Sequence, residues 1–260
     1  MPDRAARCAR LLLDARASGR PFVAKDDPAP ADVAEAYRVQ DIVLDSLDAG
    51  GRPSAWKVIP PRKGSELLAS PVPTSRVLRS PASVSAARFH MIGIESEIAF
   101  RIGRDLPPRA TPYDENEVAE GIEEALVLIE LVDTRLANWK EAPPLWKLAD
   151  FQSNGGLVVG SGVRDWRALD FTAQRVVLEV DGVVRVQESG THPAGNPFAL
   201  MPWFATHCAK RCGGLRAGDV VTTGSWTGIQ FVAPGATVVA RFPGIGEARV
   251  HGGRGLTTAQ

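Results

Sequence analysis

The chain has 260 residues, with 30 Lys and Arg against 30 Asp and Glu, so its formal charge at pH 7 is zero. This balance argues against a nucleic-acid or anionic-membrane partner, because both bind a basic surface. Apolar residues make up 44% of the chain, an ordinary share for a globular protein, and no apolar run reaches the length of a membrane span.

The N-terminal part is predicted to be helical. Residues 4–17 and 31–47 place apolar side chains at helical spacing, and Gly50 and Gly51 follow the second stretch. The Arg-rich start lacks the uninterrupted apolar core of a signal peptide, which favours a cytoplasmic location. A short strand at 54–59 and a Pro- and Ser-rich connector at 71–85 come next. We therefore expect an N-terminal subdomain over 1–85 and a catalytic β-rich domain over 86–260.

The remainder of the chain reads mostly as β-structure. A hairpin is predicted around Asp181 and Gly182, because Asp-Gly is a strong two-residue turn signal. Helices are expected only at 113–124 and 196–211, with a short helical or irregular segment at 139–149. The strands are expected at 95–102, 125–132, 155–160, 174–180, 183–187, 220–223, 238–242 and 247–250. This pattern predicts an α+β fold: a mixed β-roll or barrel preceded by a small helical subdomain.

Three acidic residues stand in predicted strands where carboxylates are costly to bury. Glu95 and Glu97 point to the same face of their strand, because side chains alternate. Two carboxylates this close raise each other's pKa unless a positive charge lies between them. Glu130 lies inside the apolar run 125–132, where an unpaired carboxylate is unfavourable. Together they indicate a site for a divalent cation. The alternatives are a solvent-facing pair on an exposed strand and a salt bridge from Glu130 to an Arg or Lys.

A lysine and a glycine-rich stretch are further candidates. Lys57 lies between Trp56 and Val58, and a lysine with apolar neighbours can act as an acid or base. A lysine on an edge strand that keeps its contact with water is the simpler alternative. Residues 224–228, Gly-Ser-Trp-Thr-Gly, follow a strand, and this pattern favours a turn with a ligand-facing hydroxyl over a phosphate loop.

These motifs together resemble the 2-keto-4-pentenoate hydratase and 4-oxalocrotonate decarboxylase group of the fumarylacetoacetate hydrolase superfamily. The resemblance covers most of the chain and is clearest over 94–250. No single segment is specific, but their order and spacing together are. The segments that carry the resemblance are 56–59, 94–100, 129–135, 148–155 and 223–228.

The resemblance implies a hydratase that adds water to a 2-hydroxy-2,4-dienoate and yields a 4-hydroxy-2-oxo acid in the catabolism of aromatic compounds. It implies Mg²⁺ or Mn²⁺ as the cofactor, a small 2-oxo or 2-hydroxydienoic acid as the substrate, and a homo-oligomer. The residues that it implies are the metal ligands Glu95, Glu97 and Glu130, the catalytic residues Lys57, Asp150 and Ser153, and the substrate-binding residues Ser225 and Thr227. In this scheme Lys57 transfers a proton or orients the substrate, and Asp150 orients Lys57 or a metal-bound water.

One departure from the group leaves alternatives open. The related hydratases tend to carry an acid between the lysine strand and the Glu-x-Glu strand, and here residues 65–91 contain only Glu66. Residues 68–71, Leu-Ala-Ser-Pro, stand where that acid is expected. A 2-oxo-acid decarboxylase is one alternative, because it shares the enolate intermediate, and a non-enzymatic partner subunit is another. An acylpyruvate hydrolase needs a water-activating base, for which His90 and His192 are the candidates, although His192 is expected to be a structural turn residue.

Overall fold

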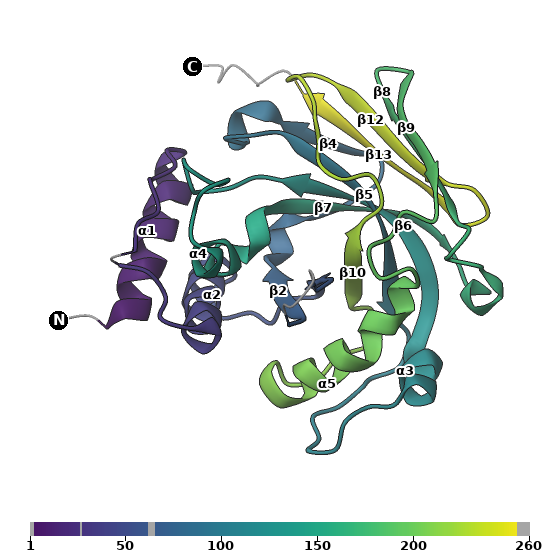
Figure 1. The fold of residues 1–260 in the computed structure, drawn as a ribbon, viewed down its shortest axis with the longest axis horizontal. Helices are drawn as coiled ribbons and strands as arrows, with labels where there is room; N and C mark the ends of the chain where they lie inside the picture. Colours follow the sequence, from purple (N-terminus) through teal and green to yellow (C-terminus); the bar gives the residue numbers. More distant parts are fainter. Residues whose placement is uncertain (1–2, 27, 62–65, 254–260) are drawn as a thin grey trace.

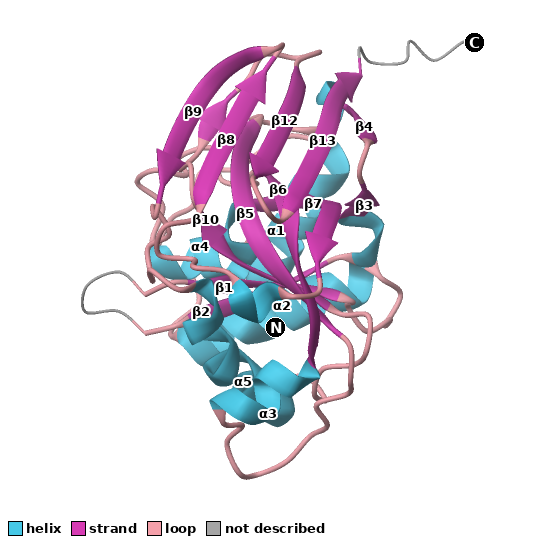
Figure 2. Cartoon of the chain, turned by 90° about the vertical axis from the view of Figure 1, so that its right-hand side faces the viewer, coloured by secondary structure: helices cyan, strands magenta, loops and turns pink. Residues whose placement is uncertain are grey.

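The computed structural model describes residues 3–26, 28–61 and 66–253 (Figure 1). A strongly curled sheet of eight strands forms the centre of the molecule. A second sheet of five strands packs against one of its faces, and the N-terminal helices lie at the opposite side (Figures 1 and 2). The predicted α+β fold with a curled, barrel-like sheet and N-terminal helices is confirmed.

The large sheet combines strands from both ends of the chain. Its order is β2 (Leu68–Val72), β1 (Ala55–Ile59), β10 (Val220–Ser225), β5 (Gly93–Ile102), β6 (Ile122–Val132), β7 (Asn154–Val163) and β3 (Val77–Arg79), with β11 (Gln230–Phe231) beside β5. The second sheet runs β4 (Ala82–Ser85), β13 (Gly246–Gly253), β12 (Thr237–Phe242), β8 (Arg175–Val180) and β9 (Val183–Ser189). Since β1 to β3 pair within the large sheet, the boundary expected between residues 85 and 86 does not coincide with a break in the sheets.

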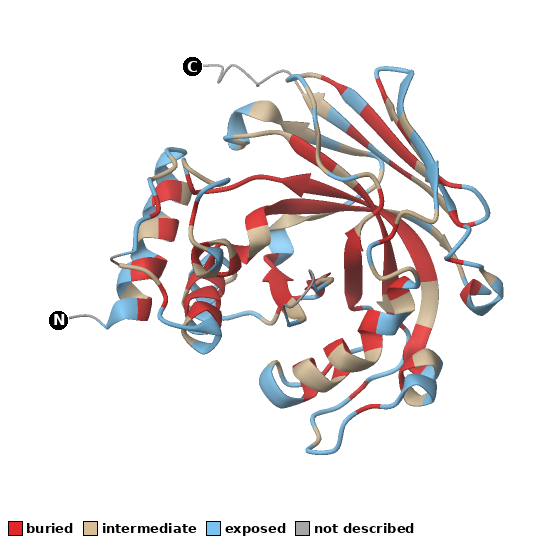
Figure 3. Ribbon diagram, viewed as in Figure 1, coloured by how far each residue is buried: buried red, intermediate tan, exposed pale blue. Residues whose placement is uncertain are grey.

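Side-chain alternation gives the large sheet two different faces. On β5, Ile94, Ile98 and Phe100 point outward and join the main hydrophobic core, which includes side chains of the second sheet and of α5 (Met201–Arg211). The residues between them point into the curl, where a smaller apolar cluster containing Ala99 and Leu128 is buried. The central strands of the large sheet are buried over most of their length (Figure 3). Polar residues that share this inner face are therefore shielded from water.

The N-terminal helices form a separate core. Asp3 caps α1 (Arg4–Ser18) and Asp32 caps α2 (Val33–Leu47), each through a backbone N–H three residues on. Together with α4 (Pro144–Ala149) they bury Leu12, Val43 and Trp146. This layer contacts β2 and the turn after α4, so it lies against one end of the curled sheet. Within the described residues, no helix has the length and hydropathy needed to span a bilayer.

Two local predictions can be compared directly with the structure. The hairpin of β8 and β9 is confirmed, and Asp181 and Gly182 have φ values of 52° and 78°, as a tight hairpin turn requires. The helix expected at 113–124 is wrong in its extent: α3 spans Glu115–Gly121, and β6 begins at Ile122. The strand extends because Arg101 on β5 pairs with Glu124, with 2.7 Å between Nε and Oε1.

Candidate active site

The structure brings the three acidic residues together on the inner face of the large sheet. Glu95 and Glu130 are directly opposite each other in the antiparallel β5–β6 ladder, and Glu97 lies two residues along the same face. One oxygen from each carboxylate lies within 4.8 Å of the others. Glu97 and Glu130 are fully buried and Glu95 is half-buried. Three buried acids at this separation need positive charge close by.

Lys57 supplies part of that charge. Its ammonium lies 2.6 Å from Oε1 of Glu130 and 3.3 Å from the carbonyl of Gln152, and the side chain is only 10% exposed. Asn154 donates a second hydrogen bond to the same Glu130 oxygen, at 3.0 Å. The salt-bridge alternative for Glu130 is therefore realised, but it uses only one of the two carboxylate oxygens.

The other oxygens identify where a cation fits. Glu97 accepts hydrogen bonds at Oε2 from the hydroxyl of Thr222 and from the backbone N–H of Gly224. Oε1 of Glu97 and Oε2 of Glu130 are buried and have no hydrogen-bond partner within the described residues. Buried acceptors are normally satisfied, so these two oxygens and the carboxylate of Glu95 form a ready donor set. Oxygen donors of this kind suit Mg²⁺ or Mn²⁺.

The pKa values of Glu95, Glu97 and Lys57 also indicate that the site needs a cation. Burial and the neighbouring Glu130 carboxylate raise the pKa of Glu95 to about 7. Burial, Glu130 and Glu95 raise the pKa of Glu97 well above its ordinary value. Burial alone would lower the pKa of Lys57, but the surrounding carboxylates outweigh it and hold that pKa above its ordinary value. Lys57 is thus a cation at neutral pH, and the site has a deficit of positive charge.

The turn after β10 lies beside the acids. Gly224 has a φ of 112°, and a Cβ there would lie 2.8 Å from the ring of Pro60, so glycine is required. Ser225 is in register with Glu97, and its nearness lowers the pKa of Glu95, yet its buried hydroxyl oxygen makes no hydrogen bond of ordinary geometry with any described residue. Thr227 instead uses its hydroxyl within the turn, accepting from Ser96 N–H and donating to the Gly228 carbonyl.

Asp150 and Ser153 lie on the loop between α4 and β7, in different surroundings from those expected. Asp150 is fully buried, and its carboxylate accepts hydrogen bonds from Arg135, Thr134 and Arg16. The Lys57 ammonium donates to Glu130 and Gln152, so Asp150 makes no direct hydrogen bond to Lys57 and is held by Arg135 instead. Ser153 is 9% exposed and has a φ of 61°, a left-handed conformation that serine rarely adopts.

Comparisons with known proteins identify the family of the chain. Residues 61–251 match the family described as Fumarylacetoacetate (FAA) hydrolase C-terminal. The chain belongs to this family. It is 29% identical over 253 residues to a 2-keto-4-pentenoate hydratase of Burkholderia vietnamiensis, covering 94% of this chain and 95% of the relative. It is 25% identical to a 4-oxalocrotonate decarboxylase of Pseudomonas sp, covering 92% and 94%. These relatives are enzymes of the superfamily expected from the sequence, and that prediction is confirmed.

A solved structure shows the same fold. The 4-oxalocrotonate decarboxylase from Pseudomonas putida G7, complexed with magnesium and adipate, superposes with a TM-score of 0.83 at 20% identity, covering 96% of this chain and 98% of that chain. The arrangement of strands in this chain is therefore also found in that solved structure.

Several residues of the site were missed by sequence reasoning. Thr222 lies opposite Lys57 in the parallel β1–β10 ladder, and Asn154 begins β7 directly after the loop. A hydroxyl in the apolar strand Val-Val-Thr-Thr was a usable signal for Thr222. Ser70, in the segment where the related hydratases tend to carry an acid, lies opposite Lys57 on the other side of β1 and accepts a hydrogen bond from the buried amide of Gln40. The segment 68–71 thus places a neutral hydroxyl, hydrogen-bonded to a buried amide, opposite Lys57.

The histidines do not form a hydrolytic dyad at the acids. His192 is buried, with Nε2 2.9 Å from the Thr223 carbonyl and Nδ1 3.2 Å from the Ala194 N–H, so both ring nitrogens serve the backbone. The expectation of a structural turn residue is confirmed. His90 is exposed, and its backbone N–H donates to Asp133.

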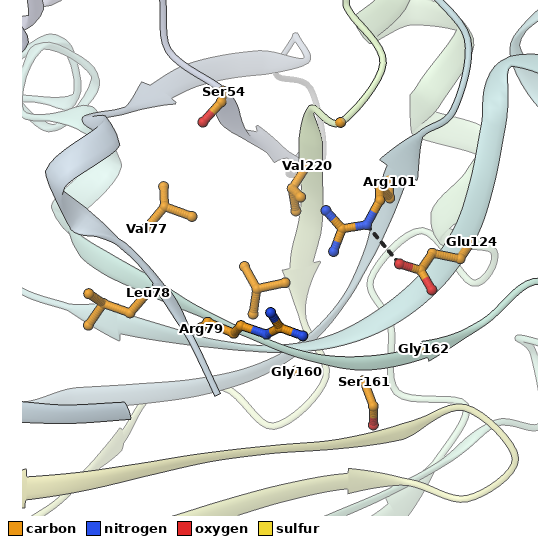
Figure 4. Close-up of a pocket in the computed structure, with 12 residues that line it drawn as sticks. Ser54, Val77, Leu78, Arg79, Arg101, Glu124, Gly160, Ser161, Gly162 and Val220 are labelled. Atoms are coloured by element: carbon orange, nitrogen blue, oxygen red, sulfur yellow. Dashed lines mark hydrogen bonds and ion pairs between the residues drawn. The ribbon is translucent and has the colours of Figure 1, made fainter. Parts of the chain in front are cut away.

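A cavity of about 640 Å³ opens at the other end of the same inner face. Arg101, on the same face of β5 as Glu95 and Glu97, forms its ion pair with Glu124 there, and Val220 and Arg79 also line the space (Figure 4). The buried apolar cluster of the inner face lies between this cavity and the acids. The acids themselves therefore sit in the more enclosed end of the curl.

Proposed function

We propose that this protein is a Mg²⁺- or Mn²⁺-dependent hydratase that adds water to a 2-hydroxy-2,4-dienoate to form a 4-hydroxy-2-oxo acid. The observation that carries the proposal is the convergence of Glu95, Glu97 and Glu130 beside Lys57, with two buried carboxylate oxygens that no described residue hydrogen-bonds. A 2-oxo acid offers a carboxylate oxygen and a keto oxygen that can chelate a cation in such a site.

The acids would hold the cation, and when bound it would supply stabilisation of the negative charge that develops on the enolate oxygen. The residues of the chain itself account for the remaining tasks. Lys57, kept protonated by its carboxylate neighbours, is suited to donate a hydrogen bond that orients the substrate, and not to abstract a proton. Ser225 is the strongest candidate for binding the substrate, because its hydroxyl is buried close enough to Glu95 to lower the pKa of that carboxyl, yet makes no hydrogen bond of ordinary geometry with any described residue.

The reaction adds water in two stages. The 2-hydroxyl group of the dienoate loses its proton and a proton is added at the terminal carbon, which gives a conjugated 2-oxo-enoate without a net change of charge. Water then adds across the double bond of that system, with its oxygen at the β-carbon and its proton at the α-carbon. Lys57 is our candidate for orienting the substrate in the first stage, and the hydroxyl of Ser153 is our candidate for positioning the water. Asp150 acts at a distance in this scheme, because its ion pair with Arg135 holds the loop that carries the Gln152 carbonyl against Lys57.

The 4-oxalocrotonate-type decarboxylase is the second candidate. One observation favours it: Ser70 and Gln40 stand where the related hydratases tend to carry an acid, so the proton-transfer partner expected of a hydratase is replaced. The hydratase is preferred because full-length relatives named 2-keto-4-pentenoate hydratase are 29% and 30% identical to this chain, against 25% for the decarboxylase.

Turnover assays separate these functions. The purified protein is offered a 2-hydroxydienoate, an oxalocrotonate-type dioate and an acylpyruvate, each with Mg²⁺, with Mn²⁺ and with a chelator. Hydration of the dienoate that requires a divalent cation is the expected result. Glu95→Gln and Glu130→Gln should each abolish it with the fold retained, as judged by circular dichroism. Unchanged turnover in both variants would reject the site. Assembly as a homo-oligomer and a cytoplasmic location are further proposals, which light scattering and cell fractionation test.

A further inference from the structure

A second group of charged residues lies where α1 meets the end of β6, outside the site just described. Two neighbouring cavities, of about 60 Å³ and 450 Å³, share three arginines in their walls: Arg16, Arg76 and Arg88. The smaller cavity is also lined by Arg135 and Asp133. We call these two cavities together the arginine groove.

The groove has more positive than negative charge. Arg135 lies 2.6 Å from Asp150 and 3.4 Å from Asp133, and Arg16 reaches Asp150 at 3.3 Å. Those two aspartates thus face two of the arginines. The side chains of Arg76 and Arg88 form no hydrogen bond or ion pair with any described residue, so no direct partner offsets their charge.

Burial makes the excess of positive charge around Arg16 unfavourable. The Arg16 side chain is only 9% exposed, and its Nε is buried without an acceptor among the described residues. Burial and the nearby Arg135 lower the pKa of Arg16 to about 9, and burial followed by Arg88 lowers that of Arg76. An unsatisfied buried N–H is unfavourable, and a charged oxygen acceptor makes the strongest hydrogen bonds to guanidinium.

We propose that the arginine groove binds an organic anion, with its carboxylate or phosphate head among Arg16, Arg76 and Arg135. The smaller cavity has room for such a head, since a water molecule occupies about 30 Å³. The larger cavity adds apolar walls from Leu13 and Pro73, which suit the body of the same ligand. None of the three acids of the metal site lines either cavity.

The groove is connected to the active site through Asp150. The carbonyl of Asp150 accepts the N–H of Ser153 at 3.0 Å, and between them Gln152 presents its carbonyl to Lys57. An anion competing with Asp150 for Arg16 and Arg135 would release part of what holds this loop. Occupancy of the groove is therefore expected to change the active-site loop as well as to fill the cavity.

The experiment measures anion binding directly. Inorganic phosphate, succinate and chloride are titrated at constant ionic strength, and binding is followed by calorimetry and by the shift in melting temperature. Phosphate or succinate should bind with a Kd at or below the millimolar range, and chloride should not substitute. The double variant Arg76→Gln/Arg88→Gln should weaken binding at least tenfold. Neither side chain has a partner among the described residues, so this variant is expected to fold.

Two control variants test whether the anion binds in the groove itself. Arg185→Gln, an exposed arginine on β9, should bind the anion as the unmodified protein does. Glu95→Gln/Glu97→Gln should also bind it, which separates the groove from the metal site and from the proposed hydratase activity. Equal binding by the Arg76→Gln/Arg88→Gln variant and the unmodified protein would overturn the proposal. The proposal would also be overturned if the unmodified protein bound no anion and the Arg76→Gln/Arg88→Gln variant changed its oligomeric state. The groove would then be an interface between copies of the chain.

Discussion

Replacing Lys57 by methionine tests the electrostatic account of the site most directly. The Lys57 ammonium lies 2.6 Å from a fully buried carboxylate, and its side chain is itself 10% exposed. Removing one partner of such a buried pair costs about 3–5 kcal/mol. For a protein of this size, that corresponds to a fall in melting temperature of roughly 6–20 °C in the absence of divalent metal.

The loss of stability in Lys57→Met should become smaller as the pH falls. Lys57 lowers the pKa values of Glu95 and Glu97, so its removal raises them further. A carboxyl with a raised pKa in the folded state binds a proton that the unfolded chain does not, so stability is recovered as the pH falls. We expect the loss of stability in Lys57→Met to be largest at pH 8 and to shrink by about 1.4 kcal/mol per pH unit for each proton that the folded variant binds beyond those bound by the unmodified protein.

Divalent metal should restore part of the stability that Lys57→Met loses, because it supplies the missing positive charge. Mg²⁺ should therefore raise the melting temperature of Lys57→Met more than that of the unmodified protein, while turnover is lost. Thermal unfolding at pH 6 and pH 8, with and without Mg²⁺, measures both effects, and Lys210→Met, on the exposed side of α5, is the control. An equal Mg²⁺ shift in both proteins, or a deficit that is the same at both pH values, would refute the reasoning.

Three other predictions follow from single groups. Glu95 has a pKa of about 7, so Mg²⁺ must displace its proton in acid; calorimetry in two buffers should show proton release and up to tenfold weaker binding per pH unit below 7. Gln40→Leu removes the buried amide that bonds Ser70 and the Leu148 carbonyl, and urea unfolding should show a loss of about 2 kcal/mol. Burial lowers the pKa of His207 to about 4, so stability should fall between pH 6.5 and 4 by on the order of 2 kcal/mol, and His207→Gln should flatten that change.

The cluster of three acids was predictable because its sequence signal is local. Glu95 and Glu97 alternate on one strand, and Glu130 interrupts an otherwise apolar run, so each acid is conspicuous within a few residues of sequence. Their convergence then follows from the pairing of β5 with β6, in which Glu95 and Glu130 are direct neighbours. The hairpin at Asp181 was predictable for the same reason, since turn chemistry is read from two adjacent residues.

The role of Asp150 and the extent of α3 were not predictable from local patterns. Asp150 is held by Arg16, which lies 134 residues away in the chain, and nothing near either residue indicates that they meet. Glu124 favours helix by composition, but its pairing with Arg101 across the sheet places it in a strand. In both cases an ion pair between residues distant in the sequence determines the local structure. Intrinsic helix and strand propensities are weaker than such a contact.

The arrangement of charge connects these observations. One end of the inner face holds three carboxylates with one ammonium among them, and the arginine groove is lined by five arginines and two aspartates. Asp150 stands between the two regions, and its loop contacts both Lys57 and Arg135. A cation bound at the acids and an anion bound in the groove would each relieve a buried excess of charge. Since the same short loop touches both, the two ligands are expected to influence each other's binding, and reciprocal titrations of Mg²⁺ and phosphate would measure that coupling.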